Sequence, residues 1–130
     1  MILSMGLDVA SVARVQHALD RFGDRFSARI LTPRERQELS SRADRAIFLA
    51  GRFAAKEALS KALGGPHDVW WQDVEVQRGP LGAPVLELRG AATAHAARLG
   101  VKRSLVSITH DAGIAAAVVV LDSDVLQFPP

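Results

Sequence analysis

The sequence predicts one α+β domain in which a mainly antiparallel sheet packs against a long central helix. The chain has 130 residues, 48% of them hydrophobic, which suits a single packed core. The strongest helical pattern is rich in Ala and Leu and covers about residues 44–63. The other elements are short strands joined by turns, and they favour antiparallel pairing. Neither a G-x-G-x-x-G nor a G-x-x-x-x-G-K-[ST] motif follows a strand, so a Rossmann or P-loop fold is not expected.

The N-terminal part predicts a strand followed by two helices. Residues 2–9 alternate loosely between apolar and polar types, which is typical of a strand. Ser11 is a suitable cap for a helix over 11–22, and a Gly-Asp break follows it. The next helix is expected to begin at Thr32, because a proline follows directly and Glu35 completes a capping box.

The C-terminal part predicts alternating strand pairs and helices. A Gly-Gly-Pro sequence at 64–66 ends the long helix. The elements expected after it are a hairpin of strands 74–76 and 85–88, a helix over 91–99, and a second strand pair at 105–108 and 114–121. Residues 1–122 form the expected domain, and 123–130 are expected to be a flexible tail.

Composition narrows the environment and the class of partner. The chain contains no cysteine, which fits a reducing cytoplasm and excludes thiol chemistry. The N-terminus lacks the pattern of a secretory signal, and the apolar run 114–121 is too short to span a bilayer. We therefore expect a soluble cytoplasmic protein with no membrane partner.

The basic residues indicate an anionic partner. Between residues 14 and 52 the chain has nine Arg and no Lys, and the sequence pI is about 9.7. Such a surface attracts a nucleic acid, a phosphorylated ligand or an acidic protein, or is simply a solvated helical face. A nucleic-acid module usually interleaves aromatic and basic residues. This chain has no Tyr, and both Trp lie at 70–71, so no nucleic-acid partner is expected.

The long helix carries two differently placed sets of charges. On a helical wheel, Arg45, Arg52 and Lys56 gather on one side, which predicts a solvent-facing stripe. Glu57 and Lys61 lie off this stripe, among small apolar residues. They are either an ordinary pair one turn apart or a functional pair that a further group completes.

Asp8 and His110 are further candidates for chemistry. Asp8 ends the first strand, where it either caps the next helix or joins Glu57 in supplying oxygen ligands to Mg²⁺. His110 is expected in the turn of a strand pair, where it binds phosphate, transfers protons or is bonded locally. No zinc-binding spacing and no nucleophile elbow around Ser107 occur.

Several segments, taken together, resemble one family. They are Gly6-Leu7-Asp8-Val9 with Arg14, the block at 48–64 that contains F-x-x-K-E-x-x-x-K, Gly82-Ala83-Pro84, and Ser107-Ile108-Thr109-His110. In this order they resemble the holo-acyl-carrier-protein synthases, which are short, single-domain 4′-phosphopantetheinyl transferases. The resemblance covers nearly the whole chain.

The resemblance implies the fold, the reaction and the assembly of that family. The reaction is Mg²⁺-dependent transfer of 4′-phosphopantetheine from coenzyme A to a serine of apo acyl carrier protein, with release of adenosine 3′,5′-bisphosphate. It serves fatty acid biosynthesis, although a polyketide-type carrier is the alternative. The family also implies a homotrimer with active sites at subunit interfaces. A non-catalytic carrier-binding module is disfavoured, because the acid pair and Lys61 are retained.

The resemblance also implies a role for individual residues. Asp8 and Glu57 match the Mg²⁺ ligands. Catalytic positions are Glu57, Lys61 and His110; coenzyme A contacts are Arg52, Lys61, Gly64, Pro84, Thr109 and His110; the acidic helix of the carrier protein meets Arg14, Arg21 and Arg25. An aspartate at position 24 departs from the pattern of this basic region. The proton of the attacking serine is expected to leave to Glu57 or to a metal-organised water.

Overall fold

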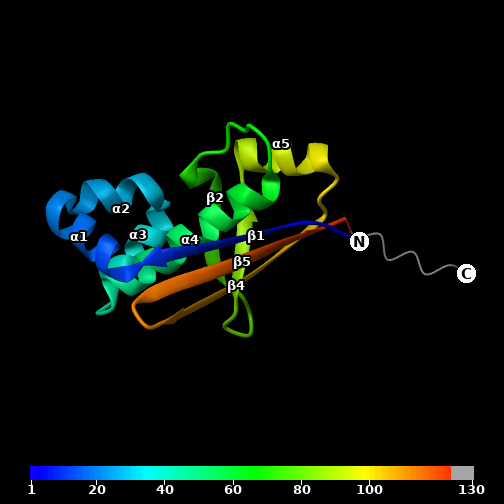
Figure 1. The fold of residues 1–130 in the computed structure, drawn as a ribbon. Helices are drawn as coiled ribbons and strands as arrows, with labels where there is room; N and C mark the ends of the chain where they lie inside the picture. Colours follow the sequence, from blue (N-terminus) through cyan, green and yellow to red (C-terminus); the bar gives the residue numbers. More distant parts are fainter. Residues whose placement is uncertain (124–130) are drawn as a thin grey trace, which may run out of the picture.

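The computed structural model describes residues 1–123, which form two antiparallel sheets with helices packed around a long central one (Figure 1). In chain order the elements are β1 (Ile2–Ser11), α1 (Val12–Phe22), α2 (Asp24–Ile30), α3 (Pro33–Ser40), α4 (Arg45–Leu63), the 3-10 turn η1 (Trp71–Asp73), β2 (Val74–Arg78), β3 (Pro84–Leu88), α5 (Gly90–Leu99), β4 (Arg103–Asp111) and β5 (Ile114–Asp122). The predicted α+β class is confirmed. Of the predicted tail 123–130, residues 124–130 lie outside the described residues. Within 1–123, no helix is both long and apolar enough to span a membrane.

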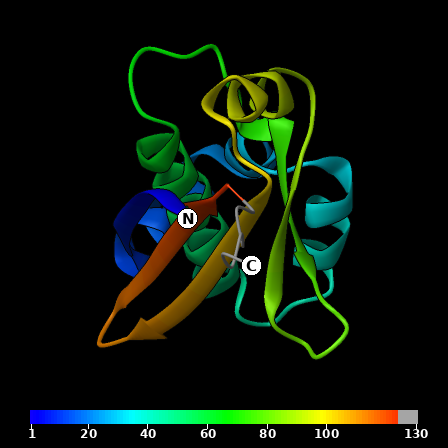
Figure 2. The ribbon, with the colours of Figure 1, turned by 90° about the vertical axis from the view of Figure 1, so that its right-hand side faces the viewer.

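The strands divide into two sheets rather than one. β1, β5 and β4 pair in that order, so β5 lies between the other two strands. β2 and β3 pair only with each other, as the predicted hairpin. Figure 2 shows β3 running beside β4, with α5 at one end of these strands. The antiparallel pairing is therefore confirmed, and its division into two sheets is a finding of the structure.

Helix α4 forms the centre of the core and packs on the inner face of the larger sheet. Leu49, Ala54 and Ala58 on this helix are fully buried. Small residues allow close approach: a Cβ at Gly6 of β1 would lie 1.8 Å from the carbonyl oxygen of Ala58. Only glycine fits there, and β1 therefore lies directly against the helix.

The local signals for helix ends are confirmed. Ser11 caps α1 by accepting a hydrogen bond from the backbone of the first turn. The side chain of Thr32 accepts from the backbone N–H of Glu35, and the Glu35 carboxylate accepts from the backbone N–H of Thr32, as the capping box requires. Gly64 ends α4 at φ 68°, a conformation that favours glycine. Each signal acts within one helical turn, which is why sequence alone could identify it.

Three local predictions were wrong. Asp8 does not end the first strand, because β1 continues to Ser11. The break after α1 is a single residue, Gly23, and α2 begins directly after it. Burial of Ser27 and Ile30 against the rest of the core stabilises this short helix, so tertiary packing determined it. His110 lies within β4 rather than in the turn, because the ladder continues to the Asp111–Ile114 pair and leaves only Ala112 and Gly113 between the strands.

Candidate functional site

The side chain of Asp8 faces the central helix because every second residue of β1 points toward that helix. The inward-facing residues of the strand include Ser4, Gly6 and Asp8. The hydroxyl of Ser4 donates to the carbonyl of Ala62 at 2.6 Å, and Gly6 allows the backbones to touch. Asp8, two residues further, therefore faces the last turns of α4. The interpretation of Asp8 as a helix cap is wrong, because Ser11 caps α1.

Lys61 joins Asp8 at the end of α4. Its ammonium donates to Oδ1 of Asp8 and to the carbonyl of Leu7, both at 3.0 Å. The Lys61 side chain is 55% exposed, whereas that of Asp8 is 15% exposed. Among the described residues, the ion pair of Lys61 is thus with Asp8, not with Glu57 one turn away. Because the ammonium lies at the surface, it can turn toward an incoming anion at little cost.

Glu57 adds a second carboxylate to this group. Its side chain is half-buried, and burial raises the pKa of its carboxyl; the nearby Asp8 carboxylate raises it further, while Lys61 lowers it. A divalent cation held by both carboxylates would relieve this repulsion. Hard oxygen donors fit Mg²⁺, which needs only one or two carboxylates besides water and phosphate oxygens. No cluster of three or more His, Asp or Glu suited to a metal occurs within residues 1–123. The two carboxylates therefore suit Mg²⁺ and leave its remaining positions to water and substrate phosphate oxygens.

A pocket of about 190 Å³ opens beside Glu57. One wall is a face of α4. The other is formed by the end of the loop that follows this helix and by the elements η1 and β2 that come after it. Its lining residues are Lys56, Glu57, Leu59, Ser60, Val69, Trp70, Trp71 and Val74. The Trp71 ring stacks on Phe53 of α4, with 5.2 Å between ring centroids. The pocket thus combines an apolar wall with a carboxylate at one side.

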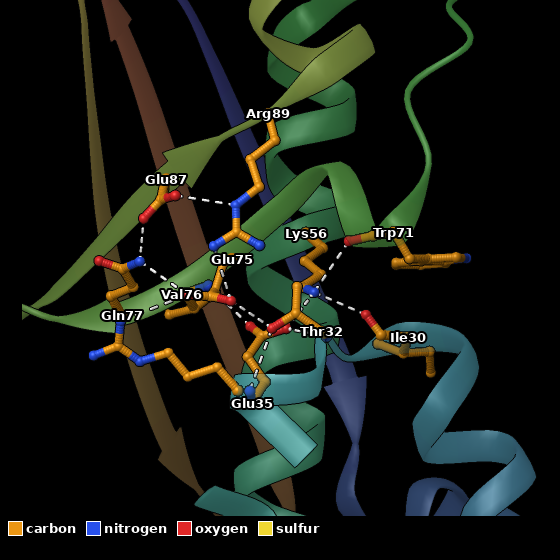
Figure 3. A network of polar contacts seen from close by, with 11 residues as sticks. Ile30, Thr32, Glu35, Lys56, Trp71, Glu75, Val76, Gln77, Glu87 and Arg89 are labelled. Carbon is orange, nitrogen blue, oxygen red and sulfur yellow. Dashed lines mark hydrogen bonds and ion pairs between the residues drawn. The ribbon is translucent and has the colours of Figure 1, made fainter. Parts of the chain in front are cut away.

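Lys56 is buried, contrary to the predicted solvent stripe. Its residue is only 3% exposed, and its ammonium donates to the Glu35 carboxylate at 2.6 Å and to the carbonyls of Ile30 and Trp71 at 2.8 and 3.1 Å (Figure 3). Burial lowers the pKa of Lys56, and Glu35 opposes this effect. The helical wheel failed here because it cannot show that the α2–α3 junction and η1 cover this side of α4.

A second candidate group surrounds Arg52. Its guanidinium carbon lies 4.1 Å from the centroid of the Phe48 ring. Its Nε is buried and has no hydrogen-bond partner within residues 1–123. Burial is the main cause that lowers the pKa of Arg52. A buried donor without a partner is uncommon in folded proteins and is consistent with a position that an anionic ligand completes.

A pocket of about 210 Å³ next to Arg52 is lined by several cationic side chains. Its lining residues are Arg42, Arg52, Gln77, Arg78, Gly82, Pro84, Ile108 and His110. A smaller neighbouring pocket also contains Thr109 and His110. Arg42 and Arg78 were not among the predicted site residues. Arg78 could have been found from the predicted hairpin. The strand register places it directly opposite Pro84, which was a predicted coenzyme A contact.

The two groups lie on different sides of the chain. Asp8 is on β1 and His110 on β4, the two edges of the larger sheet, with β5 between them. On α4, Arg52 and Glu57 are five residues apart, which corresponds to about 140° around the helix axis. Gly64 follows directly after α4 and belongs to the end that carries the Asp8 group. One copy of the chain thus holds two separate candidate groups, one around Asp8 and Glu57 and one around Arg52.

The predicted carrier-binding arginines are all exposed on the first two helices. Arg14 and Arg21 are exposed on α1, seven residues apart and hence on the same face. Arg25 is exposed on α2. Arg21 lies over the ring of Phe22, which is itself 52% exposed. The surface therefore combines positive charge with an exposed aromatic ring.

Comparison with known proteins identifies the family of the chain. The model of the 4′-phosphopantetheinyl transferase superfamily matches residues 4–119. A holo-[acyl-carrier-protein] synthase of Anaeromyxobacter sp. (strain K) is 51% identical over 125 residues, covering 94% of this chain and 97% of that protein.

Solved structures of the same kind share the fold. The holo-[acyl-carrier-protein] synthase of Neisseria meningitidis superposes with a TM-score of 0.86 at 31% identity, covering 94% of this chain and 99% of that one. That of Helicobacter pylori, solved in complex with coenzyme A, gives a TM-score of 0.77 at 33% identity, covering 91% and 99%. The chain therefore belongs to the 4′-phosphopantetheinyl transferase superfamily and, within it, to the holo-acyl-carrier-protein synthases.

Proposed function

We propose that this chain transfers 4′-phosphopantetheine from coenzyme A to a serine of an acyl carrier protein and releases adenosine 3′,5′-bisphosphate. The single observation that carries the proposal is the group formed by Asp8, Glu57 and Lys61, of which Glu57 also lines a pocket on α4. Two carboxylates suit a magnesium ion and an exposed ammonium suits a phosphate, so the group can hold both partners of a phosphoryl-transfer reaction. The coenzyme A complex of the Helicobacter pylori relative supports the choice of donor.

The two candidate groups, around Asp8 and around Arg52, match the two charged parts of coenzyme A. We call each of them a half-site. Lys61, with Gly64 at the helix end, would contact the pyrophosphate. The nucleotide end would be held by Arg52, Pro84, Thr109 and His110. Its 3′-phosphate would supply an anion for the buried Nε of Arg52. Two further arginines line the same pocket, Arg42 and Arg78. The pocket beside Glu57 would take the pantetheine arm, because Glu57, one of the two proposed metal ligands, lines it.

In the proposed reaction, the serine oxygen of the carrier forms a bond to the β-phosphorus of coenzyme A. The bond from that phosphorus to the bridging oxygen breaks, and adenosine 3′,5′-bisphosphate leaves. Lys61 stabilises the negative charge that develops on the phosphate oxygens. When bound by Asp8 and Glu57, Mg²⁺ supplies further positive charge to the same oxygens. The serine proton passes to Glu57 or to a water beside it, and the His110 imidazole orients the nucleotide.

We further propose that the enzyme is a homotrimer in which each active site combines half-sites from two copies. The outer face of β1 exposes Met5, Leu7 and Val9 at 62%, 61% and 53%, and Leu105 of β4 is 48% exposed. These apolar side chains lie on the same face of one sheet, and exposed patches of this kind commonly mark protein contacts. A second copy on this face would also supply the half-site that a single chain keeps apart. Light scattering would test the assembly, and Leu7→Asp should dissociate it.

We propose that the acidic helix of the carrier protein docks on Arg14, Arg21 and Arg25. The reaction would take place in the cytoplasm, as a step of fatty acid synthesis. All three residues are exposed, Arg14 and Arg21 on one face of α1 and Arg25 in the first turn of α2. Complementary charge accelerates association and is weakened by salt. We therefore expect the KM for the carrier to rise with ionic strength.

The direct test is to incubate the protein with coenzyme A, Mg²⁺ and apo acyl carrier protein and to weigh the carrier. We expect the carrier to gain the mass of one phosphopantetheine. The gain should disappear with EDTA and with Asp8→Ala, which removes one of the proposed ligands. If several apo carriers, including a fatty-acid and a polyketide type, gained no mass, the proposed activity would be wrong and only the family and its fold would stand.

A further inference from the structure

The lysine next to Glu57 has no free donor for a substrate. The ammonium of Lys56 carries three hydrogens, and it has three acceptors: the Glu35 carboxylate, the Ile30 carbonyl and the Trp71 carbonyl. The side chain is 1% exposed, as is that of its partner Glu35. Lys56 is therefore unsuited to bind phosphate, although it neighbours a proposed metal ligand in the sequence.

The three acceptors of Lys56 belong to different parts of the chain. Ile30 ends α2 and Glu35 is in the first turn of α3. The hydrogen bonds from Lys56 to these two acceptors therefore hold α2 and α3 against one side of α4. The other oxygen of Glu35 accepts from the backbone N–H of Val76 in β2 at 2.9 Å. Figure 3 shows this arrangement, with the Lys56 ammonium between Glu35, Ile30 and Trp71. A single buried cation thus joins α4 to three other elements.

The third acceptor belongs to the wall of the pocket beside Glu57. Trp71 begins η1 and lines that pocket with Val69 and Trp70, opposite the face of α4. The Trp71 ring is held by stacking on Phe53, and its backbone by the 3.1 Å bond from Lys56. Lys56, the residue directly before Glu57, therefore fixes the distance between this wall and the helix face that carries Glu57.

We propose that Lys56 is a positioning residue that holds the wall at residues 69–71 (the tryptophan wall) against the Glu57 face of α4, and so keeps the pocket shaped for the arm of the donor. This inference rests on the proposed function, because it takes the pantetheine arm as the occupant of the pocket. Without the ammonium, the Trp71 carbonyl loses its partner and the tryptophan wall separates from the helix. The donor then binds a less ordered pocket, so its KM rises while the carrier is affected little.

The test compares two neutralised positions in the same network. Lys56→Met alone leaves the Glu35 carboxylate buried without its cation, so the main variant is the double substitution Lys56→Met with Glu35→Gln. The matched control is Glu75→Gln, since Glu75 is equally buried and accepts from Thr32 at 2.6 Å but does not contact the tryptophan wall. Lys56→Gln serves as the conservative variant, because its amide retains a donor for the carbonyl of Trp71.

The first readout is independent of catalysis. The chain has two tryptophans, so a Trp70→Phe background leaves Trp71 as the only one. We expect the acrylamide quenching constant of Trp71 to rise about twofold or more in the double variant, to be intermediate in Lys56→Gln and to be unchanged in Glu75→Gln, because only the first two loosen the wall locally. Equal quenching in the double variant and the wild type, or equal increases in the double variant and Glu75→Gln, would overturn the positioning role. If the double variant does not unfold cooperatively, the same comparison is made with Lys56→Gln alone.

The second readout is kinetic, in the chain with both tryptophans. We expect the KM for coenzyme A to rise about tenfold in the double variant, with the KM for the carrier unchanged and a smaller effect in Lys56→Gln. A uniform loss of kcat that tracks loss of folded protein in all variants would contradict positioning. If the wild type transfers nothing, the proposed function is wrong, whereas the quenching result still decides whether Lys56 holds the wall.

Discussion

The two lysines of the K-E-x-x-x-K segment occupy opposite environments, although they lie on one helix only five residues apart. Lys56 is buried with all three of its hydrogen-bond donors used. Lys61 is more than half exposed and shares its ammonium between Asp8 and the Leu7 carbonyl. A saturated buried cation holds elements in place, whereas an exposed cation can exchange one anion for another. The same residue type therefore serves structure at one position and, we propose, chemistry at the other.

The acids around the two lysines differ in the same way. Glu35 is fully buried and its oxygens accept hydrogen bonds from Thr32, Lys56 and Val76. Glu57 is only half-buried, and burial together with the nearby Asp8 carboxylate raises the pKa of its carboxyl. A satisfied carboxylate is stable as it stands, but one that lacks sufficient partners favours a proton or a cation. The difference between satisfied and unsatisfied charge thus separates the scaffold from the candidate active site.

Lys56→Met should give the largest effect. We expect the free energy of unfolding to fall by about 3–5 kcal/mol, because removing one partner of a buried ion pair leaves the Glu35 carboxylate uncompensated. Adding Glu35→Gln should recover part of this loss. Urea denaturation followed by circular dichroism measures both values. A loss below about 1 kcal/mol for the single substitution would mean that the buried pair resembles a surface one.

Lys61→Met should show the reverse pattern. We expect kcat to fall about 100- to 1000-fold, since the variant lacks a cation that stabilises charge in the transition state. The free energy of unfolding should change by no more than about 1 kcal/mol, because the Lys61 side chain is 55% exposed and water can replace its ammonium. The matched control is Lys102→Met, which removes an exposed lysine from the start of β4. Equal activity of the two variants would exclude Lys61 from catalysis.

Arg52→Met should weaken binding of the nucleotide end of coenzyme A. We expect a rise in KM of about tenfold or more, because a hydrogen bond to a charged group contributes about 1.5–3 kcal/mol. Coenzyme A without its 3′-phosphate should bind the wild type and the variant alike. Steady-state kinetics with both donors measures this, and Arg45→Met, on the same helix but outside the pocket, is the control. An equal loss with both donors would place Arg52 away from the 3′-phosphate.

Asp122 should give the smallest effect, and one that depends on pH. Hydrogen bonds from the Met1 ammonium and from Arg103 lower the pKa of Asp122 from 3.8 to about 2. Because the folded-state pKa is the lower one, the stabilisation is present above about pH 4 and is lost as the pH falls toward 2. The melting temperature of Asp122→Asn should therefore lie below that of the wild type at pH 7, and the two should converge near pH 2. A constant difference across this range would show that the charge of Asp122 is not the cause.

The candidate site was predicted better in its members than in its arrangement. Asp8, Glu57 and Lys61 could be singled out from helical spacing together with the family resemblance, although Asp8 lies within β1 and does not end it. Their contact depends on Gly6, which brings β1 onto α4 over a sequence separation that no local pattern spans. Arg42 and Arg78 were missed for the same reason, since only the packing of β3 against β4 closes the pocket that they line.

The sequence by itself determined the α+β class, the ends of α1 and α4, the start of α3, and the spacing of charges along α4. These features follow from interactions within one or two turns, such as the capping box of Thr32 and Glu35 and the glycine at position 64. The tertiary structure alone decided which of these charges are covered, because burial depends on what packs over a helix face. For Lys56, the α2–α3 junction and η1 supply that cover and turn an expected solvent-facing lysine into the centre of a buried network.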